Sequence, residues 1–221
     1  MKKFLASVLV FLVAFMTAGC FSFSLGGFTY DDDGYEEYSV FKAEDHDFSG
    51  VTKVNIEWIS GETEIRQGDF AVSDSATKGE FFPSYYKLSG NQLWVKFAKN
   101  GTSYSYLNDK SKALSITLPA TFAEIELKVV SANYDVDLIL MDKLNVDAVS
   151  GEGNVRITTL GSADINTVSG NVTMKVSTVN LTSLSFHSVS ANVELNADIL
   201  KKPNVKFESV SGNLTLKNYL V

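Results

Sequence analysis

The sequence predicts an all-β protein in which coils of about 20 residues stack on one another as a solenoid. From residue 51 onward, apolar and polar residues alternate with the period of a β-strand, and no convincing amphipathic helix occurs. A phrase of the type Val-Ser-Gly or Val-Ser-Ala also recurs at steps of 19, 19, 21 and 21 residues, with its valine at Val130, Val149, Val168, Val189 and Val210. A fixed period in a strand-rich sequence is typical of a solenoid, because each repeat forms one coil.

Residues 1–19 predict a lipoprotein signal peptide. Two lysines form a positive region, and the uncharged apolar run from Phe4 to Ala18 is shorter than the roughly 20 residues that a membrane-spanning helix needs. The run ends in Thr-Ala-Gly-Cys, which resembles a bacterial lipobox with threonine where leucine is commoner. We therefore expect cleavage between Gly19 and Cys20, and attachment of diacylglycerol to the cysteine thiol.

Lipidation of Cys20 would explain why an exported chain has a single cysteine and hence no disulfide framework. Each buried methylene of an acyl chain contributes about 0.8 kcal/mol, so two or three chains hold a protein stably at a lipid bilayer. An ordinary secreted protein and an uncleaved anchor with a spare buried thiol are the alternatives. We expect an outer-membrane protein in a host with two membranes, which Phe21 favours, and a protein on the outer face of the cell membrane in a host with one.

Residues 20–50 predict an acidic tether between this anchor and the folded part. The segment includes Tyr30–Tyr38, which reads YDDDGYEEY, and a self-repelling acidic chain stays extended. A calcium loop is the alternative interpretation, but the EF-hand spacing is absent. The whole chain has a formal net charge of −7, which becomes about −9 when Lys2 and Lys3 leave with the signal peptide. This balance argues against nucleic acid as a partner and against electrostatic capture by anionic lipid.

Residues 51–221 are expected to form the solenoid itself, with irregular amino-terminal coils and a cap over residues 51–125. Short alternating runs bounded by turn residues indicate the strands of this part. We expect them at Val51–Ile59, Tyr86–Leu88, Leu93–Phe97, Leu114–Leu118 and Ile125–Val130. Weaker versions of the repeated phrase occur here as Ile59-Ser60-Gly61 and Leu88-Ser89-Gly90.

A group of aromatic residues stands out in the same part of the chain. It consists of Phe81, Phe82, Tyr85, Tyr86, Trp94, Tyr104 and Tyr106. The rings can form the hydrophobic cap that closes the first coil, which is the interpretation that we favour. The alternative is a binding patch, because exposed rings stack on sugars and anchor protein partners.

Residues 126–221 predict the regular repeats. Large apolar residues lie five and three positions before each corner valine, and four and six positions after it. The alternation of apolar and polar positions shifts by one residue once in each repeat. We place this change of parity between the valine and the residue before it, where a bulge or corner would exchange the two faces of the strand. Gly or Ala two positions after the valine leaves room where the chain bends. The repeated phrase is therefore interpreted as architecture, with a repeated ligand site as the alternative.

Coils in register would also align one asparagine from each in a ladder of hydrogen-bonded amides. Its members would be Asn133, Asn171, Asn192 and Asn213. The coil of Val149 departs from the pattern, since VSGEGN is interpreted as an insertion of two residues that delays Asn154. The last coil, Asn213–Val221, has no obvious cap, so its unpaired backbone is predicted to pair with a partner or with a second copy.

The stretch Ala113–Ile157 carries a resemblance to a known family. It reads ALSITLPATFAEIELKVVSANYDVDLILMDKLNVDAVSGEGNVRI and is followed by the VSGNV coils. With these motifs, residues 50–221 resemble the bacterial adhesin-like DUF4097 family, many members of which are exported or lipidated. The resemblance implies a parallel β-helix-like solenoid and supplies no catalytic residues. This sequence departs from the family at Ala132 and Ala191, where glycine is usual.

The sequence predicts neither an enzyme nor a cofactor or metal site. There are two histidines, His46 in the tether and His187 on a coil. His187 shares its coil position with polar residues, so we expect it to face solvent, and no Ser-His-Asp arrangement is evident. The one cysteine is assigned to lipid, which excludes cysteine-based zinc sites.

The expected function is therefore non-catalytic adhesion or scaffolding at the envelope surface, with an envelope protein or a glycan as partner. One alternative is a carbohydrate-binding or carbohydrate-active β-helix protein, and another is an envelope-stress sensor. A shared fold does not distinguish these alternatives.

Overall fold

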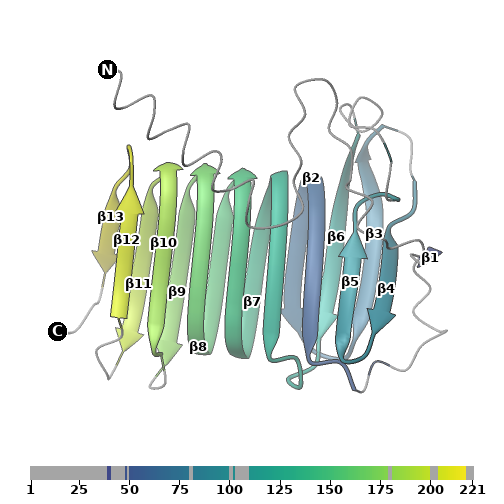
Figure 1. Cartoon of the computed structure of the whole chain (residues 1–221), viewed down its shortest axis with the longest axis horizontal. Coiled ribbons are helices and arrows are strands. Elements are labelled where there is room, and N and C mark those ends of the chain that lie inside the picture. Colours follow the sequence, from purple (N-terminus) through teal and green to yellow (C-terminus); the bar gives the residue numbers. More distant parts are fainter. Residues whose placement is uncertain are drawn as a thin grey trace.

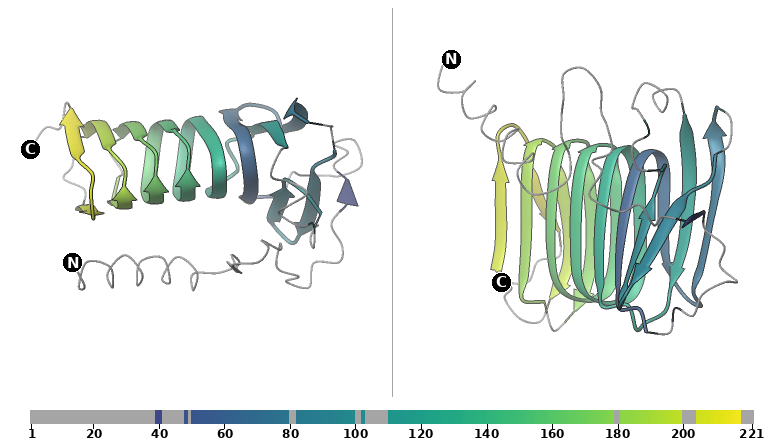
Figure 2. Two further views of the ribbon diagram at one scale, coloured as in Figure 1. Left: turned by 90° about the horizontal axis from the view of Figure 1, so that it is seen from above. Right: turned by 45° about the vertical axis from the view of Figure 1, so that its right-hand side comes forward.

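The computed structural model describes residues 39–40, 48, 50–79, 82–99, 102, 110–178, 181–199 and 204–217. Within these ranges every regular element is a strand, and all the strands belong to one 13-stranded sheet. The strands are β1 (Ser39–Val40), β2 (Lys53–Gln67), β3 (Ala71–Lys78), β4 (Tyr85–Ser89), β5 (Gln92–Lys96), β6 (Ser111–Leu118), β7 (Glu124–Ser150), β8 (Gly153–Ser169), β9 (Val172–Thr178), β10 (Ser183–Ser190), β11 (Val193–Ile199), β12 (Asn204–Ser209) and β13 (Leu214–Lys217). Figure 1 shows the strands side by side along the molecule, and Figure 2 shows the two layers that they form. The predicted all-β solenoid is confirmed.

Successive coils of the stack pair in parallel. β2 pairs with β7 along almost its whole length, and β7 pairs in the same way with β8. β8 then pairs with β10 in one layer and with β9 in the other, while β12 and β13 form the last coil. The pairing of the neighbouring residues places four corner valines above one another: Val149, Val168, Val189 and Val210.

The serine of the repeated phrase has a structural role in the corners at Ser131, Ser150 and Ser169. Ser150 Oγ donates to the carbonyl oxygen of Val130 (3.1 Å), and Ser169 Oγ donates to that of Val149 (3.2 Å). The hydroxyl therefore satisfies a backbone carbonyl of the preceding coil at the bend. This hydrogen bond accounts for serine at these corners without any ligand.

The change of parity lies one residue later than predicted. Ala148 is buried, whereas Val149 and Ser150 are both only partly buried and follow one another on the outer side. The two faces are therefore exchanged between valine and serine, because the serine side chain must reach across to the preceding coil. The corner valine does not belong to the core, and Val210 in the last coil is 37% exposed.

Glycine is required at the tightest corners. Gly170 has φ +107°, which L side chains rarely adopt, and a Cβ there would overlap the carbonyl oxygen of Gly151 in the coil before. The corners at Ala132 and Ala191 hold alanine in buried positions, so the departure from the family pattern leaves the stacking intact.

Gly170→Ala is expected to lower the free energy of unfolding by about 2–4 kcal/mol, because it combines backbone strain with a contact against immobile backbone. Gly90→Ala is the matched control, since Gly90 also has a positive φ (+59°) but nothing lies within 4 Å of a Cβ there. The control should cost about 1 kcal/mol. Urea denaturation of both variants measures the difference, and equal losses would contradict the close approach at the corner.

The coil of Val149 contains no insertion, so that prediction is wrong. Tyr134 pairs with Gly153, and Gly153 pairs with Val172, in unbroken register. Gly153 thus occupies the inward position that holds valine in the next coil, and a Cβ there would overlap the ring of Tyr134. The sequence of this coil is irregular because the large side chain of Tyr134 in one coil fills the space left by Gly153 in the next.

The asparagine ladder is confirmed for three of its four members. Asn192 Nδ2 donates to Asn171 Oδ1, and Asn213 Nδ2 donates to Asn192 Oδ1, both at 3.2 Å. Asn133 instead accepts a hydrogen bond from the backbone N–H of Glu152 (2.9 Å). Glu152 occupies the ladder position of its coil, which separates Asn133 from the other three.

Antiparallel strands build the amino-terminal end. β3 pairs with β6, β4 with β5 and β1 with β4, all antiparallel. The phrase at Ser60 is a true corner that pairs with the corner of β7, whereas Ser89-Gly90 forms the turn of the β4–β5 hairpin. The fold also begins before residue 51, because β1 joins the sheet and Phe48 stacks on Phe70 with ring centroids 4.1 Å apart. The predicted tether over residues 20–50 therefore overlaps the folded part.

Candidate binding surfaces

A buried lysine lies inside the amino-terminal end of the solenoid. Lys112 on β6 is 0% exposed, and its Nζ donates to the carbonyl oxygens of Phe97 (2.7 Å) and Phe82 (3.3 Å) and to Ser84 Oγ (3.0 Å). Asp74 Oδ2 on β3 lies 3.3 Å from Nζ and acts as the counter-ion. Desolvation by burial lowers the pKa of Lys112 to about 8, although the Asp74 carboxylate opposes this shift.

Aromatic rings enclose the same ammonium group. Nζ lies 5.0 Å from the ring centroid of Trp58, 4.4 Å from that of Phe82 and 4.8 Å from that of Phe97. Trp58 Nε1 in turn donates to the backbone carbonyl of Lys112 (3.0 Å). These contacts lie inside the amino-terminal end of the stack and keep the ammonium group away from solvent.

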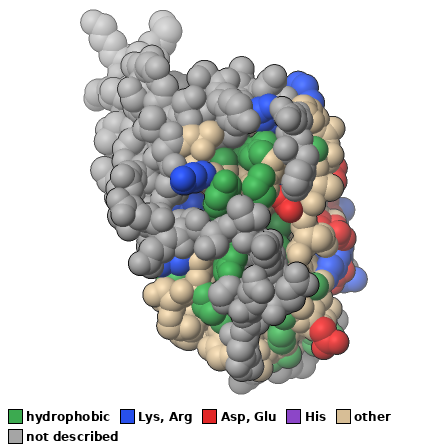
Figure 3. All heavy atoms as spheres, turned by 90° about the vertical axis from the view of Figure 1, so that its right-hand side faces the viewer, with side chains coloured by type: hydrophobic (Ala, Val, Ile, Leu, Met, Phe, Trp, Pro, Cys, Tyr) green, Lys and Arg blue, Asp and Glu red, His purple; other side chains and the backbone are tan. Residues whose placement is uncertain are grey.

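The structure divides the predicted aromatic patch. Tyr86 is 4% exposed and Phe82 packs against the core, so the cap interpretation accounts for both. Tyr85 and Trp94 are partly buried on the outer side, and a binding role for them stays a prediction. Figure 3 shows hydrophobic side chains gathered near the middle of this end of the molecule. The other three members, Phe81, Tyr104 and Tyr106, lie outside the described residues.

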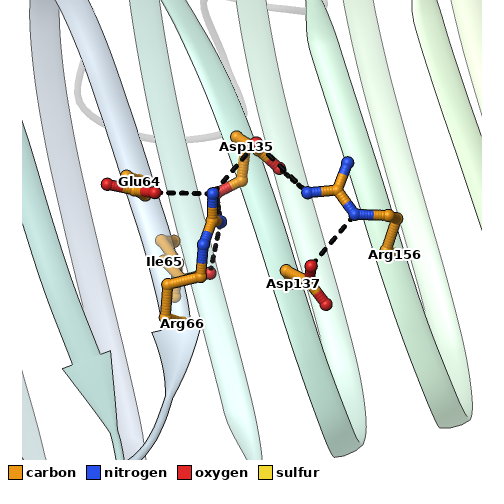
Figure 4. Close-up of polar contacts among 6 residues, drawn as sticks. All are labelled: Glu64, Ile65, Arg66, Asp135, Asp137 and Arg156. Carbon is orange, nitrogen blue, oxygen red and sulfur yellow. Dashed lines mark hydrogen bonds and ion pairs between the residues drawn. The ribbon is translucent and has the colours of Figure 1, made fainter.

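A network of charged side chains crosses the outer face of the layer that includes the carboxyl-terminal half of β2. Asp135 accepts hydrogen bonds from Arg66 Nη2 (3.0 Å) and from Arg156 Nη2 (2.9 Å), and thus joins three coils. Arg156 Nε also donates to Asp137 Oδ2 (3.0 Å), and Glu64 pairs with Arg66 at 2.6 Å (Figure 4). Hydrogen bonds from Arg156 to Asp137 and Asp135 raise the pKa of the guanidinium.

The network continues as a row of outward positions in register. Arg156 pairs with Lys175 in the next coil, and the row ends at Lys217, which lies 2.8 Å from Glu194. Exposed ion pairs of this kind contribute little to stability, typically 0–1 kcal/mol each. Their effect is to hold long side chains in fixed positions on a flat, regular surface.

The opposite layer carries a polar chain that the sequence interpretation missed. Ser185 Oγ lies 2.8 Å from His187 Nε2, and His187 Nδ1 lies 3.0 Å from Glu208 Oε2. Glu208 comes from the following coil, so only the register of β10 on β12 brings these residues together. The predicted position of His187 in a polar column is correct, since it pairs with Asn166 on one side and Glu208 on the other.

The three side chains Ser185, His187 and Glu208 follow one another in the order of a nucleophile, a base and a carboxylate. Acyl transfer also requires free hydrogen-bond donors at the developing oxyanion. β10 lies between β8 and β12, so its backbone N–H groups are used in the two ladders beside Ser185. The arrangement therefore fits a structural hydrogen-bond chain better than a hydrolytic site.

No cluster of three or more potential metal ligands occurs among the residues with described positions. The predicted lipidation site Cys20 and the cleavage position after Gly19 lie outside the described residues. Within the described part of the chain, no helix has the length and hydrophobicity to span a bilayer.

Comparison with solved structures finds several similar folds, including the following two. One is described as a "putative cell adhesion protein" from Clostridium sporogenes, with 15% identity, a TM-score of 0.48, and coverage of 82% of this chain and 97% of that chain. The other is described as a "putative adhesin" from Bacteroides fragilis, with 14% identity, a TM-score of 0.35, and coverage of 76% and 92%. At these values the likenesses do not bear on function.

Among curated proteins, none matches this sequence. The profile of the Toastrack DUF4097 family matches residues 50–220, which include almost the whole solenoid. The chain therefore belongs to the Toastrack DUF4097 family.

Proposed function

We propose that this chain is a non-catalytic, lipid-anchored protein of the bacterial envelope surface that acts as an adhesin or scaffold. In this proposal Cys20 carries the lipid, and the outer faces of the solenoid contact an envelope glycan or protein. The observation that supports it most is the network of charged side chains around Asp135, which joins three coils, together with the row that continues from it. Solenoids commonly bind through extended regular surfaces of this kind.

The geometry of the row favours a ligand that is itself extended. Parallel strands lie about 4.8 Å apart, so each coil adds one set of polar groups at that interval. The row carries both signs of charge, with Asp135 and Asp137 beside Arg156 and Lys175. A glycan that bears hydroxyl, amide and carboxylate groups would find both donors and acceptors. Because the ion pairs already restrict the side chains, less rotamer entropy is lost on binding.

Cosedimentation with purified peptidoglycan sacculi tests the proposed glycan contact. The complete chain in a non-ionic detergent should pellet with the sacculi, and Arg156→Ala should weaken that binding by about tenfold, as expected for an interface arginine. Lys143→Ala is the control, because Lys143 is exposed on the opposite layer. Equal binding by both variants, or cleavage of the glycan by the wild type, would overturn this function.

Membrane fractionation of cells tests the anchor separately. The wild type should remain with the membranes after a high-salt wash, because acyl chains rather than charge hold it there. Cys20→Ser removes the acceptor thiol and should abolish lipid labelling of the protein. Unchanged labelling of this variant would rule out lipidation at Cys20.

A further inference from the structure

The carboxyl-terminal end of the solenoid leaves core positions uncovered. Phe186 is 1% exposed, whereas its partner in the last coil, Phe207, is only partly buried. On the other layer Leu195 is 0% exposed, whereas its partner Leu216 is 46% exposed. Side chains at these two inward positions are buried in the preceding coil and more exposed in the last one, because no described strand lies on the outer side of β12 or β13.

The two ends of the stack differ in kind. The antiparallel strands β3 and β4 and the enclosed Lys112 close the amino-terminal end. At the carboxyl-terminal end, β12 and β13 are the outermost described strands of the two layers (Figure 1). Each pairs with a described strand on one side only, so the backbone groups of its outer edge are available for pairing. A repeated head-to-tail stack would need matching coil edges at both ends, whereas the described strand β3 at the amino-terminal end is antiparallel to its neighbour β6.

We propose that the last coil pairs with the last coil of a second copy of this chain about a two-fold axis. Edge strands that face each other across such an axis run antiparallel, so β12 would add to β12 of the second copy and continue one layer. β13 would meet its own copy in the other layer. Leu214 and Leu216 of the two molecules would then cover one another.

The charges of β12 complement themselves in this arrangement. With Phe207 on the axis, Lys206 lies across from Glu208 of the second copy, and Glu208 lies across from Lys206 of the second copy. Both side chains are outward and about half exposed, at 55% and 52%. Opposite charges that face each other across antiparallel strands stabilise the pair, and like charges destabilise it.

The inward residues also distinguish this edge from a protected one. One common way in which native edges are protected is an inward-pointing charge. Here the inward residues Val205 and Phe207 on β12, like Leu214 on β13, are apolar and pack against the core. The edge is therefore suited to a second copy, which brings the same apolar side and the reversed order of charges.

Sedimentation velocity of the complete chain in density-matched non-ionic detergent tests this dimer. Lys206→Glu and Glu208→Lys each place two like-charge pairs across the axis, and each should weaken dimerisation at least about tenfold. The double variant Lys206→Glu/Glu208→Lys restores opposite charges and should dimerise within about threefold of the wild type. Lys143→Glu is the control for a general effect of charge, since its side chain is similarly exposed (51%) and lies away from the edge.

Each outcome decides the proposal. A monomer at all concentrations would overturn it. A dimer that the single charge reversals leave unchanged would place the association elsewhere, for example at the lipid anchor. Failure of the double variant to recover would exclude the two-fold register. This inference goes beyond the proposed function, since a monomeric chain can still bind sacculi.

Discussion

Asp74→Ala is expected to lower the free energy of unfolding by about 3–5 kcal/mol at pH 7, because it leaves the buried ammonium of Lys112 without a counter-ion. The group cannot reach water, since the Lys112 side chain is 0% exposed. Its remaining partners are neutral carbonyl and hydroxyl oxygens and aromatic rings. Urea denaturation followed by tryptophan fluorescence measures the loss, and Trp58 lies beside the affected site.

A second substitution tests whether the loss comes from the buried charge. Lys112→Met keeps a long apolar side chain and removes the ammonium, so Asp74→Ala/Lys112→Met should be more stable than Asp74→Ala alone by about 2 kcal/mol. This recovery is specific to an unpaired charge. If the two substitutions instead add their separate losses, Asp74 stabilises the fold mainly through its hydrogen bonds to Ser84.

The lowered pKa of Lys112 also predicts how stability changes with pH. The folded protein releases this proton near pH 8, whereas the unfolded chain keeps it until about pH 10.5. Below pH 8 Lys112 is charged in both the folded and the unfolded state, and the folded state bears the full cost of burying the ammonium. Between pH 8 and 10.5 the folded state has released the proton while the unfolded chain still holds it, so the free energy of unfolding increases over this interval. The stability of wild type relative to Lys112→Met should therefore increase by about 2–3 kcal/mol between pH 7 and pH 10. A difference that does not change with pH would contradict the assigned pKa.

The regular part of the fold could be predicted because its signals are local. Each corner repeats the same valine, serine and small residue, and the arms on either side alternate with period two. The strand β3 was missed because its sequence, AVSDSATK, is polar, and because β6 is its one partner among the described strands. Its position depends on an available edge, which the sequence of the segment does not reveal.

Contacts between coils were the part that sequence patterns could not supply. The Asp135 network and the chain from Ser185 to Glu208 join residues that only the register brings together. Lys112 did carry a signal, because it has the same parity as the buried Leu114 and Ile116 in an alternating run. A lysine in phase with core residues indicates a buried ammonium, but the alternation does not reveal the rings that enclose it, since Trp58 comes from β2.

Gly153→Val is expected to destabilise the protein by at least about 3 kcal/mol, even though it restores the residue that the repeat favours. The neighbouring coils hold Val172 and Val193 in the same inward column. At Gly153, however, the ring of Tyr134 fills the space of the missing side chain, and Tyr134 is only 2% exposed. The added methyl groups would displace a ring that has no free volume to enter.

The companion substitution should recover most of that loss. Tyr134→Val/Gly153→Val gives both coils the side chain of Val172, so the double variant should be more stable than Gly153→Val alone by about 2 kcal/mol or more, a coupling typical of residues in contact. Tyr134→Phe is the control for the hydroxyl, which is buried without a hydrogen-bond partner among the described residues. Removing it should leave stability unchanged or raise it by about 1 kcal/mol, because an unsatisfied buried hydroxyl is unfavourable. Thermal unfolding of the wild type, Gly153→Val, Tyr134→Val and the double valine variant gives the coupling directly. If the effects of the two valine substitutions simply add, the exchange of volume between these coils does not determine their packing.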